Sequence, residues 1–206
     1  MEPFKKLRAA AAPIDITNLD TNQLCPTRFN KIPLTDPDYQ RILFNNQRYQ
    51  SDGTLTDFIL NRPPYRDSQI LVGDENFGCG SSRESAVYAL VAFGIRVIIA
   101  PSFGDIFFSN CTKNGLLPVI LASDICAAWR AALHTEPGLQ FEVDLEGLCV
   151  TGPAQEKHVF SLHPTIRERM LAGLDEVGIT RELNDHITAF EEAHKIRMPW
   201  AFSATD

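Results

Sequence analysis

Two serines and an arginine follow a glycine-rich segment in the middle of the chain, and these residue types can act together on a small anion. Ser81, Ser82 and Arg83 come directly after the Gly-Cys-Gly of residues 78–80. Glycines let the backbone turn sharply, so that several N–H groups can point at one anionic group. The guanidinium of Arg83 can bind a carboxylate through two parallel hydrogen bonds. The residues therefore indicate a site for a carboxylate or a phosphate.

The surrounding pattern predicts which elements position this segment. Residues 69–72 form a short apolar run typical of a buried strand, and residues 86–93 carry apolar side chains at helical spacing. Ser81 stands three residues before Glu84, which is the spacing of a capping box, so we expect the helix to begin at the two serines. Open α/β sheets bind their ligands at the carboxyl ends of the strands. The loop at residues 73–84 is therefore the candidate site.

The rest of the chain repeats the alternation of strand and helix. Strands are expected at residues 96–100, 116–121, 141–145, 148–150 and 159–162, helices at 104–114, 123–133, 164–173 and 180–195, and an N-terminal strand that follows the alanine run and ends near 14–16. Strands joined by helices through short connections imply a parallel sheet, whereas the alternation after residue 138 indicates a hairpin. We expect one α/β domain over residues 1–206, with a helical C-terminal extension from about residue 164 that Gly173 and Gly178 interrupt.

The bulk composition excludes several classes of function. A net charge of −7 over 206 residues argues against a nucleic-acid partner, because phosphate neutralisation needs clustered Lys and Arg. No segment approaches the roughly 18 consecutive apolar residues of a membrane span. Five scattered cysteines indicate neither a disulfide framework nor a zinc or iron–sulfur motif, so no metal is expected on this chain. A reducing, cytoplasmic setting is expected.

Three common motifs are absent from the glycine-rich loop. A P-loop would require a lysine after its last glycine, a dinucleotide fingerprint would require glycine where Arg83 stands, and a hydrolase elbow would require Gly-x-Ser-x-Gly. On the residues alone, one alternative stays open. Ser81 and Glu84 could serve only as a helix cap, with Arg83 as an exposed surface charge.

The string from Gly73 to Glu84, Gly-Asp-Glu-Asn-Phe-Gly-Cys-Gly-Ser-Ser-Arg-Glu, resembles the signature of the swivelling domain in the aconitase superfamily. Its Gly-Cys-Gly-Ser-Ser-Arg-Glu form is similar to that of isopropylmalate isomerase small subunits. Further similar segments lie at residues 18–26, 98–107, 114–119 and 141–146. The resemblance follows the chain in order over most of its length. It implies a swivelling β/β/α three-layer domain with a mostly parallel central sheet.

The resemblance also implies an activity and a partner. Members of this family are hydro-lyases that interconvert 2-isopropylmalate and 3-isopropylmalate, hydroxy-dicarboxylates of leucine biosynthesis, by dehydration and rehydration. A large subunit holds a 4Fe–4S cluster whose iron acts as a Lewis acid, so this chain would bind no cofactor. Carried over residue by residue, Ser81 takes the proton and Arg83 clamps a substrate carboxylate. Ser82 and Gly80 belong to the substrate-binding set, and Arg28 is a candidate clamp for a second carboxylate.

Two departures from the family pattern bear on the substrate. Asn22 stands where the family has the second acid of Asp-Thr-Asp, and Ser85 stands where it has histidine. They leave two alternatives open, a paralogous subunit acting on another hydroxy-diacid, such as a methylated malate or a citrate-like acid, and a non-catalytic regulatory module that retains the anion loop. A third alternative, an independent phosphate- or nucleotide-binding domain, rests on the glycine-rich loop alone.

Overall fold

A mixed β-sheet forms the centre of the molecule. The computed structural model describes residues 1–80 and 83–202, and within them seven strands form one sheet in the order β4-β3-β2-β1-β5-β6-β7. The strands are β1 (Lys6–Pro13), β2 (Ile70–Val72), β3 (Val97–Ala100), β4 (Leu117–Ile120), β5 (Gln140–Asp144), β6 (Cys149–Thr151) and β7 (Lys157–Val159). From β1 to β4 the neighbouring strands are parallel, whereas β1, β5, β6 and β7 are antiparallel neighbours. The parallel half and the hairpin were both predicted from the sequence.

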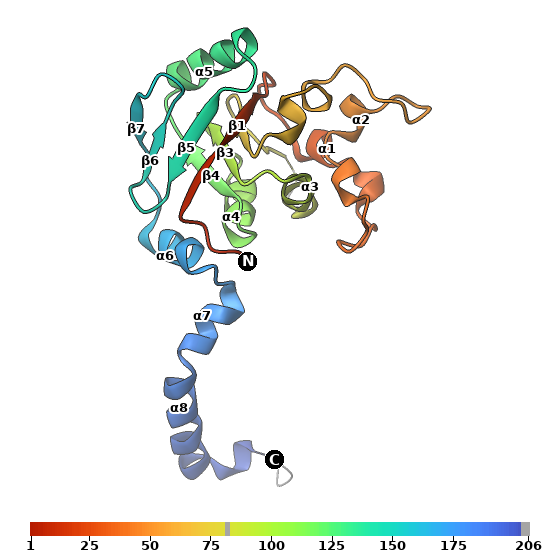
Figure 1. Cartoon of the computed structure of the whole chain (residues 1–206). Coiled ribbons are helices and arrows are strands. Elements are labelled where there is room, and N and C mark those ends of the chain that lie inside the picture. Colours follow the sequence, from red (N-terminus) through yellow and green to blue (C-terminus); the bar gives the residue numbers. More distant parts are fainter. Residues whose placement is uncertain (81–82, 203–206) are drawn as a thin grey trace.

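Helices cover both faces of the parallel half (Figure 1). The helices in the described part are α1 (Thr21–Leu24), α2 (Asn45–Arg48), α3 (Ser85–Phe93), α4 (Asp105–Lys113), α5 (Ser123–Thr135), α6 (Pro164–Ala172), α7 (Glu176–Glu182) and α8 (Asn184–Arg197). Short 3-10 turns lie at η1 (Thr27–Phe29), η2 (Tyr39–Arg41), η3 (Ile59–Asn61), η4 (Tyr65–Asp67) and η5 (Pro199–Ala201). The α/β class expected from the sequence is confirmed.

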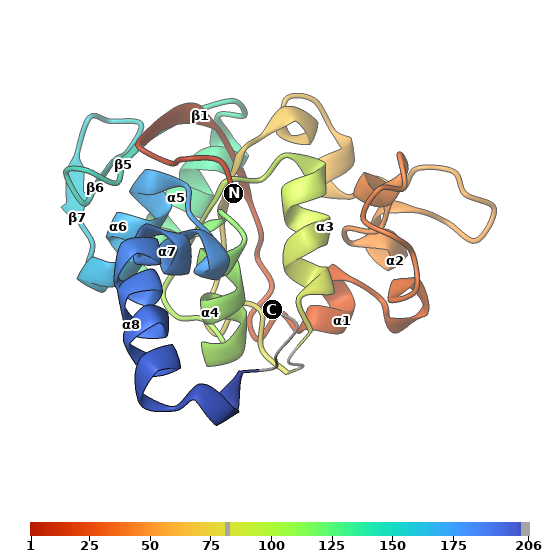
Figure 2. The same ribbon diagram turned by 90° about the horizontal axis from the view of Figure 1, so that it is seen from below.

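Alternating side chains of the buried strands build one core on each face of the sheet. Leu71 and Ile98 pack with α3 and α4, and Ile70 and Ile99 pack with α5 and the hairpin. Strands buried on both faces read as continuous apolar runs, because each face is covered by helices. Figure 2 shows α3 and α4 lying together beneath the sheet. This packing holds the loops at the carboxyl ends of the strands in fixed positions.

The segment between β1 and β2 forms a side layer of short helical turns against α3 (Figures 1 and 2). Leu24, Phe44 and Leu60 from this layer are fully buried in the same core as Leu90 of α3. The sequence pattern predicted no elements here, because turns of three or four residues carry no periodicity. The layer supplies residues that contact the candidate site.

Three expected boundaries are wrong. The alanine run lies inside β1, which ends at Pro13 rather than near residues 14–16. The last strand is Lys157–Val159, because it is this stretch that pairs with β6. Gly178 does not interrupt the C-terminal extension. It lies within α7, where its N–H donates to the capping carboxylate of Asp175 at 2.6 Å.

The C-terminal helices α7 and α8 extend away from the body of the molecule (Figure 1). Large apolar side chains are exposed along this C-terminal segment, from α7 through α8 to η5, namely Val177, Leu183, Ile187, Phe190, Ile196 and Trp200. Among the described residues, no helix combines the length and the apolar character that crossing a bilayer would require.

Candidate active site

The site loop, defined as residues 73–84, leaves the carboxyl end of β2 and leads into α3. Gly73 N donates to Ile99 O on β3 at 2.8 Å, and Gly78 N donates to Leu19 O, just beyond β1, at 2.7 Å. Hydrogen bonds thus join the loop to β3 on one side and to the segment that follows β1 on the other. It lies at the carboxyl edge of three parallel strands, the place where open α/β sheets bind ligands, as the sequence predicted.

Aromatic packing fixes the loop on α4. Phe77 and Phe107 have ring centroids 5.8 Å apart, and Phe103 packs against both. Gly78 has a φ of +73°, and a Cβ built there would lie 2.2 Å from the Phe107 ring. The position requires glycine both for its backbone conformation and for the close approach of the ring.

A hollow of about 280 Å³ lies between the site loop and the N-terminus of α4. It is lined by Asn76, Gly78, Cys79, Gly80, Gly104, Asp105, Ile106 and Phe107. Gly80 has a φ of +95°, so the backbone turns here as a glycine permits. Ser81 and Ser82 lie outside the described residues, and the roles expected for them and for Gly80 remain predictions.

Arg83 is held by neutral oxygens of the side layer. Its guanidinium donates from Nη2 to Asn22 Oδ1 and from Nη1 to Thr27 Oγ1, the latter at 3.0 Å. The Thr27 hydroxyl in turn donates to Asn22 Oδ1 at 2.9 Å. Two side chains from different turns therefore fix one guanidinium beside the site loop. Such preorganisation is what a carboxylate clamp requires.

Asp20 organises the helical turn that carries Asn22. Its Oδ1 accepts from Asn22 N at 2.7 Å and from Gln23 N at 2.9 Å, and Gln23 Oε1 accepts from Asp20 N at 3.1 Å, which completes a capping box. The Asp-x-x-Gln spacing could have predicted this turn from the sequence. The family resemblance alone does not predict it. The Asp20 carboxylate thus accepts hydrogen bonds from the backbone of α1, and the Asn22 side chain contacts Arg83.

Arg28 lies next to Thr27 on η1, and its guanidinium is turned toward α2. Nη2 donates to Asn45 Oδ1 and to Asn46 Oδ1, both at 2.7 Å, and the guanidinium carbon lies 4.5 Å from the centroid of the Phe29 ring. The structure thus brings Arg28 to the same side layer that holds Arg83. Its predicted role as a second carboxylate clamp stays a prediction.

The helix after the site loop begins later than the sequence predicted. α3 starts at Ser85, with Glu84 as its N-cap, rather than at Ser81 and Ser82. The Glu84 carboxylate makes no capping bond, because it accepts from the Tyr88 hydroxyl at 2.5 Å instead. This hydrogen bond, together with burial, raises the pKa of Tyr88 to about 12. Ser85 is the first residue of the helix, and its Oγ donates to Asn30 Oδ1 at 3.3 Å.

A buried arginine on α5 supports the base of the site loop. Arg130 is 9% exposed, and it donates from Nε to Asp15 Oδ1 at 2.9 Å and from Nη1 to Gly73 O at 2.5 Å. Its Nη2 lies 3.3 Å from Asp74 Oδ1. Nε2 of His134, one helical turn along, lies 2.6 Å from Asp15 Oδ2. The charge pattern does not predict this network, since Asp15, Asp74 and Arg130 are far apart in the chain.

Asp74 connects this network to the loop backbone. Its carboxylate accepts from the Thr17 hydroxyl at 2.8 Å and from Glu75 N at 2.9 Å. Burial acts to raise the pKa of Asp74, but these hydrogen bonds and the charge of Arg130 outweigh burial and hold the pKa below its ordinary value. The carboxylate is therefore stabilised in its ionised form at the start of the loop.

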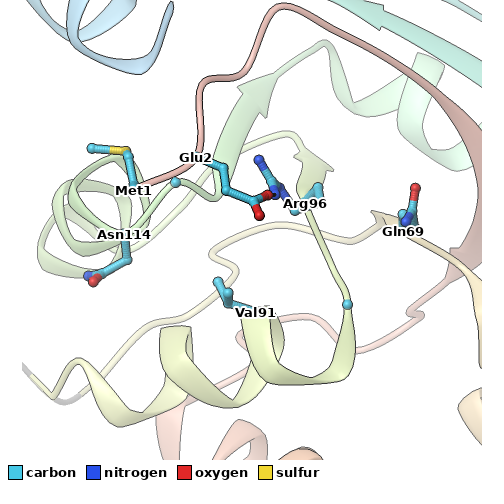
Figure 3. A pocket seen from close by; sticks show the side chains of 8 residues that line it. Met1, Glu2, Gln69, Val91, Arg96 and Asn114 are labelled. Carbon is cyan, nitrogen blue, oxygen red and sulfur yellow. Dashed lines mark hydrogen bonds and ion pairs between the residues drawn. The ribbon is translucent and has the colours of Figure 1, made fainter. Parts of the chain in front are cut away.

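A second hollow, of about 500 Å³, lies at the opposite end of the parallel strands (Figure 3). Gln69 and Arg96, which directly precede β2 and β3, line it, and Figure 3 shows Glu2 and Arg96 pointing toward each other. Their ion pair measures 2.5 Å between Glu2 Oε2 and Arg96 Nη1. Because the site loop lies at the other end of the sheet, this hollow is not part of the candidate site.

The described residues offer no metal centre. Within residues 1–80 and 83–202, no three His, Cys, Asp or Glu side chains are grouped as metal ligands. The five cysteines are free thiols. Burial raises the pKa of Cys111 far above its ordinary value and that of Cys126 to about 11, which disfavours the thiolate form that metals bind. An iron–sulfur cluster does not fit this part of the chain.

Comparisons with known proteins place this chain among related sequences and folds. A family model described as the aconitase C-terminal domain matches residues 1–124. A 3-isopropylmalate dehydratase small subunit from Granulibacter bethesdensis is 43% identical over 97% of this chain and 96% of its own length. One from Paramagnetospirillum magneticum is 42% identical over 97% of this chain and 100% of its own length. A crystal structure of 3-isopropylmalate dehydratase from Methanocaldococcus jannaschii aligns with a TM-score of 0.65 and 23% identity, over 90% of this chain and 99% of that one, and confirms the predicted fold.

Proposed function

The chain belongs to the aconitase C-terminal domain family and, within it, to the 3-isopropylmalate dehydratase small subunits, and we propose that it is one half of such a hydro-lyase. With a large subunit it would interconvert 2-isopropylmalate and 3-isopropylmalate, a step of leucine biosynthesis. The observation that carries the proposal is Arg83, held ready by Asn22 and Thr27 beside the site loop. A fixed guanidinium at the carboxyl edge of the sheet suits a dicarboxylate substrate.

The roles that we propose for this chain's residues are those that the family resemblance implies. Ser81, as an alkoxide, takes a proton from the carbon next to the hydroxyl-bearing carbon, and the electron pair of that C–H bond forms the carbon–carbon double bond. The hydroxyl leaves its carbon as hydroxide, which a proton from the solvent converts to water. Rehydration in the opposite sense returns the proton and places the hydroxyl on the adjacent carbon. A serine is a weak base, so its alkoxide needs cationic, N–H-rich surroundings. Arg83 grips a substrate carboxylate, with Ser82, Gly80 and Arg28 completing the substrate contacts.

The site requires a partner. We assign the 4Fe–4S cluster to the large subunit, as the family resemblance implies. The exposed apolar side chains of α7 and α8 support the presence of a partner, since exposed apolar surface marks contacts with other proteins. The five free cysteines support a cytoplasmic location. The same proposal takes residues 1–206 as one swivelling domain with a helical extension from about residue 164.

The test is reconstitution with the large subunit from the same genome. The chain alone is expected to be colourless and inactive, and the pair to be brown and active on 3-isopropylmalate. Ser81→Ala and Arg83→Ala should each lower kcat/KM at least a hundredfold, the order of loss known for removal of one group that stabilises a transition state. Unchanged circular dichroism and complex formation serve as controls. Full activity of both variants would show that the roles are wrongly assigned.

Asn22 and Ser85 make a paralogous substrate the second candidate, since both depart from the family pattern within the side layer and α3. The same assay with 2-methylmalate and with citrate separates the two. A higher kcat/KM on either acid than on isopropylmalate would replace the substrate while keeping the reaction. Formation of a complex without turnover on any of the three acids would favour a regulatory module.

A further inference from the structure

Arg48 is a buried arginine whose hydrogen bonds all go to neutral groups. It ends α2 and is 8% exposed. Nε donates to Asn61 Oδ1 at 3.1 Å, and Nη1 donates to Gln40 O at 3.0 Å and to Leu43 O at 3.2 Å. In residues 1–80 and 83–202, Nη2 finds no acceptor. One edge of this buried cation is thus left with unused hydrogen-bonding capacity.

Arg48 lacks the carboxylate partners that Arg130 has. These are the two buried arginines in the described chain, and Arg130 lies between the carboxylates of Asp15 and Asp74. No carboxylate of the described residues forms an ion pair with Arg48. A buried charge without a counter-charge is costly. Burial, followed by repulsion from Arg41, acts to lower the pKa of Arg48, and only Tyr49 acts in the opposite direction.

Arg48 lines a pocket that gathers positive charge. The pocket measures about 270 Å³ and is lined by Gln40, Arg41, Arg48, Tyr49, Leu55, Leu60, Asn61, Arg66, Asp67 and Phe93. Arg41 and Arg66 stand exposed at its rim. The one acid of the lining, Asp67, lies 3.4 Å from Arg66 Nε and is 77% exposed in its side chain. Three guanidiniums therefore share this pocket with a single, solvated carboxylate.

Aromatic rings hold the guanidiniums in place without neutralising them. Cζ of Arg48 lies 4.7 Å from the centroid of the Phe93 ring and 5.2 Å from that of the Tyr49 ring. Arg41 contacts the same tyrosine, with its Cζ 5.1 Å from the ring centroid. Cation–π contacts of this kind orient a cation while leaving its N–H groups available. The rings thus favour a fixed set of donors over a flexible surface charge.

We propose that the pocket of Arg41, Arg48 and Arg66 binds a small oxyanion, a carboxylate or a phosphate, as a second anion site of this chain. The site loop contributes nothing to its lining, and the pocket lies where α3 ends, whereas the site loop lies where α3 begins. Paired arginines are the usual recognition element for both anions, because the planar fork of donors matches two oxygens at once. The volume of the pocket suits one small anion.

The position of the pocket links it to the candidate active site. The single helical turn α2 carries Asn45 and Asn46, which hold Arg28, and Arg48, which lies in the pocket. An anion on Arg48 stabilises this turn and thereby the position of Arg28. This link rests on the proposed function, but binding itself does not, so the two are tested separately.

Isothermal titration of the full chain with inorganic phosphate and with succinate, at constant ionic strength in sodium chloride, tests the site. At least one anion is expected to bind with a Kd in the millimolar range or below. The double variant Arg41→Gln/Arg66→Gln, which leaves the contacts of Arg48 intact, should weaken binding at least tenfold. Binding of one anion alone supports the site and identifies its ligand class. Absence of binding by both up to about 50 mM overturns the proposal.

Matched variants locate the bound anion. Arg181→Gln/Arg197→Gln removes the same charge from the C-terminal helices and should leave the affinity unchanged. Arg83→Gln should also leave it unchanged. If Arg83→Gln abolishes phosphate binding and the rim variant does not, the anion belongs to the site loop and the proposal fails. In the wild type, phosphate should shift the side-chain Nε–Hε resonance that Arg48→Lys removes, and an unmoved resonance at saturation would equally refute the assignment.

Discussion

Arg130 donates a hydrogen bond from Nε to Asp15 Oδ1 at 2.9 Å, although the two residues are 115 positions apart in the chain. The contact joins α5 to the segment that leaves β1, and Arg130 also donates to the carbonyl of Gly73, the first residue of the site loop. One buried side chain therefore fixes two of the segments that meet at the candidate active site. Its contacts lie at the base of the loop.

Arg130→Gln is expected to lower both stability and turnover. The substitution removes the cation between Asp15 and Asp74, and the loss of such hydrogen bonds to charged groups costs roughly 1.5–3 kcal/mol each. Because Gly73 then loses its donor, the loop is held less firmly, and kcat of the reconstituted enzyme should fall more than KM rises. Arg130→Lys keeps the charge and should restore part of kcat. Urea unfolding of the chain and steady-state kinetics of the complex measure the two effects.

Arg167 offers a matched control for this prediction. Like Arg130, it donates to backbone carbonyl groups, in this case those of Leu145 and Glu146, at the far end of the sheet from the site loop. Arg167→Gln should cost stability without changing kcat. Equal losses of kcat in the variants of Arg130 and Arg167 would mean that Arg130 acts only through global stability.

Asn22 is expected to act through Arg83. Asn22→Ala removes the oxygen that accepts from both Arg83 and the Thr27 hydroxyl. The guanidinium is then less ordered before substrate binds, so KM should rise by about tenfold, which corresponds to roughly 1.4 kcal/mol, with a smaller change in kcat. Asn22→Asp keeps the acceptor but adds a negative charge that competes with the substrate carboxylate, and its KM should depend on salt. If KM in both variants stays within twofold of the wild type, Asn22 does not position the clamp.

Gly78 is expected to tolerate no side chain. In Gly78→Ala the new Cβ would lie 2.2 Å from the Phe107 ring, at a φ of +73°. Overpacking costs about 1–3 kcal/mol, and the left-handed backbone adds roughly 1–2 kcal/mol. Gly53→Ala is the control, since Gly53 has a φ of +83° with nothing within 4 Å of the added Cβ and should lose the backbone contribution alone. Similar free energies of unfolding for the two variants would show that the Phe107 ring moves away from the added Cβ without loss of stability.

The strand, loop and helix around the site could be predicted from the sequence because their signals are local. The apolar runs at residues 69–72 and 96–100 are buried on both faces, and such runs read clearly. The start of α3 at Ser85 could not be predicted from spacing, because the Glu84 carboxylate accepts a hydrogen bond from the Tyr88 hydroxyl and Glu84 is itself the N-cap residue. That choice depends on the position of Tyr88, which the capping rule does not include.

The partners of the candidate residues depend on contacts between distant segments. Arg83 could be identified as a candidate clamp from its loop, but its contacts with Asn22 and Thr27 require the side layer, which has no periodic pattern. The same holds for Arg130 and Asp74, which lie on different elements. Sequence spacing identifies residues that share one element, and it carries little information about side chains brought together by the fold.

Asp74 predicts how stability depends on pH. Hydrogen bonds from Thr17 and Glu75 N and the charge of Arg130 outweigh burial, so the pKa of Asp74 is lower in the folded chain than in the unfolded chain. The unfolded chain then binds a proton more readily, and the stability that Asp74 contributes is present above its ordinary pKa of 3.8 and is lost as the pH falls through the folded value. Asp74→Asn should therefore cost roughly 1.5–3 kcal/mol near pH 7, the net worth of hydrogen bonds to a charged group. Its stability should approach that of the wild type below about pH 4. Urea unfolding of both proteins across this range measures the difference, and a difference that stays constant down to pH 3 would contradict the assigned ionisation.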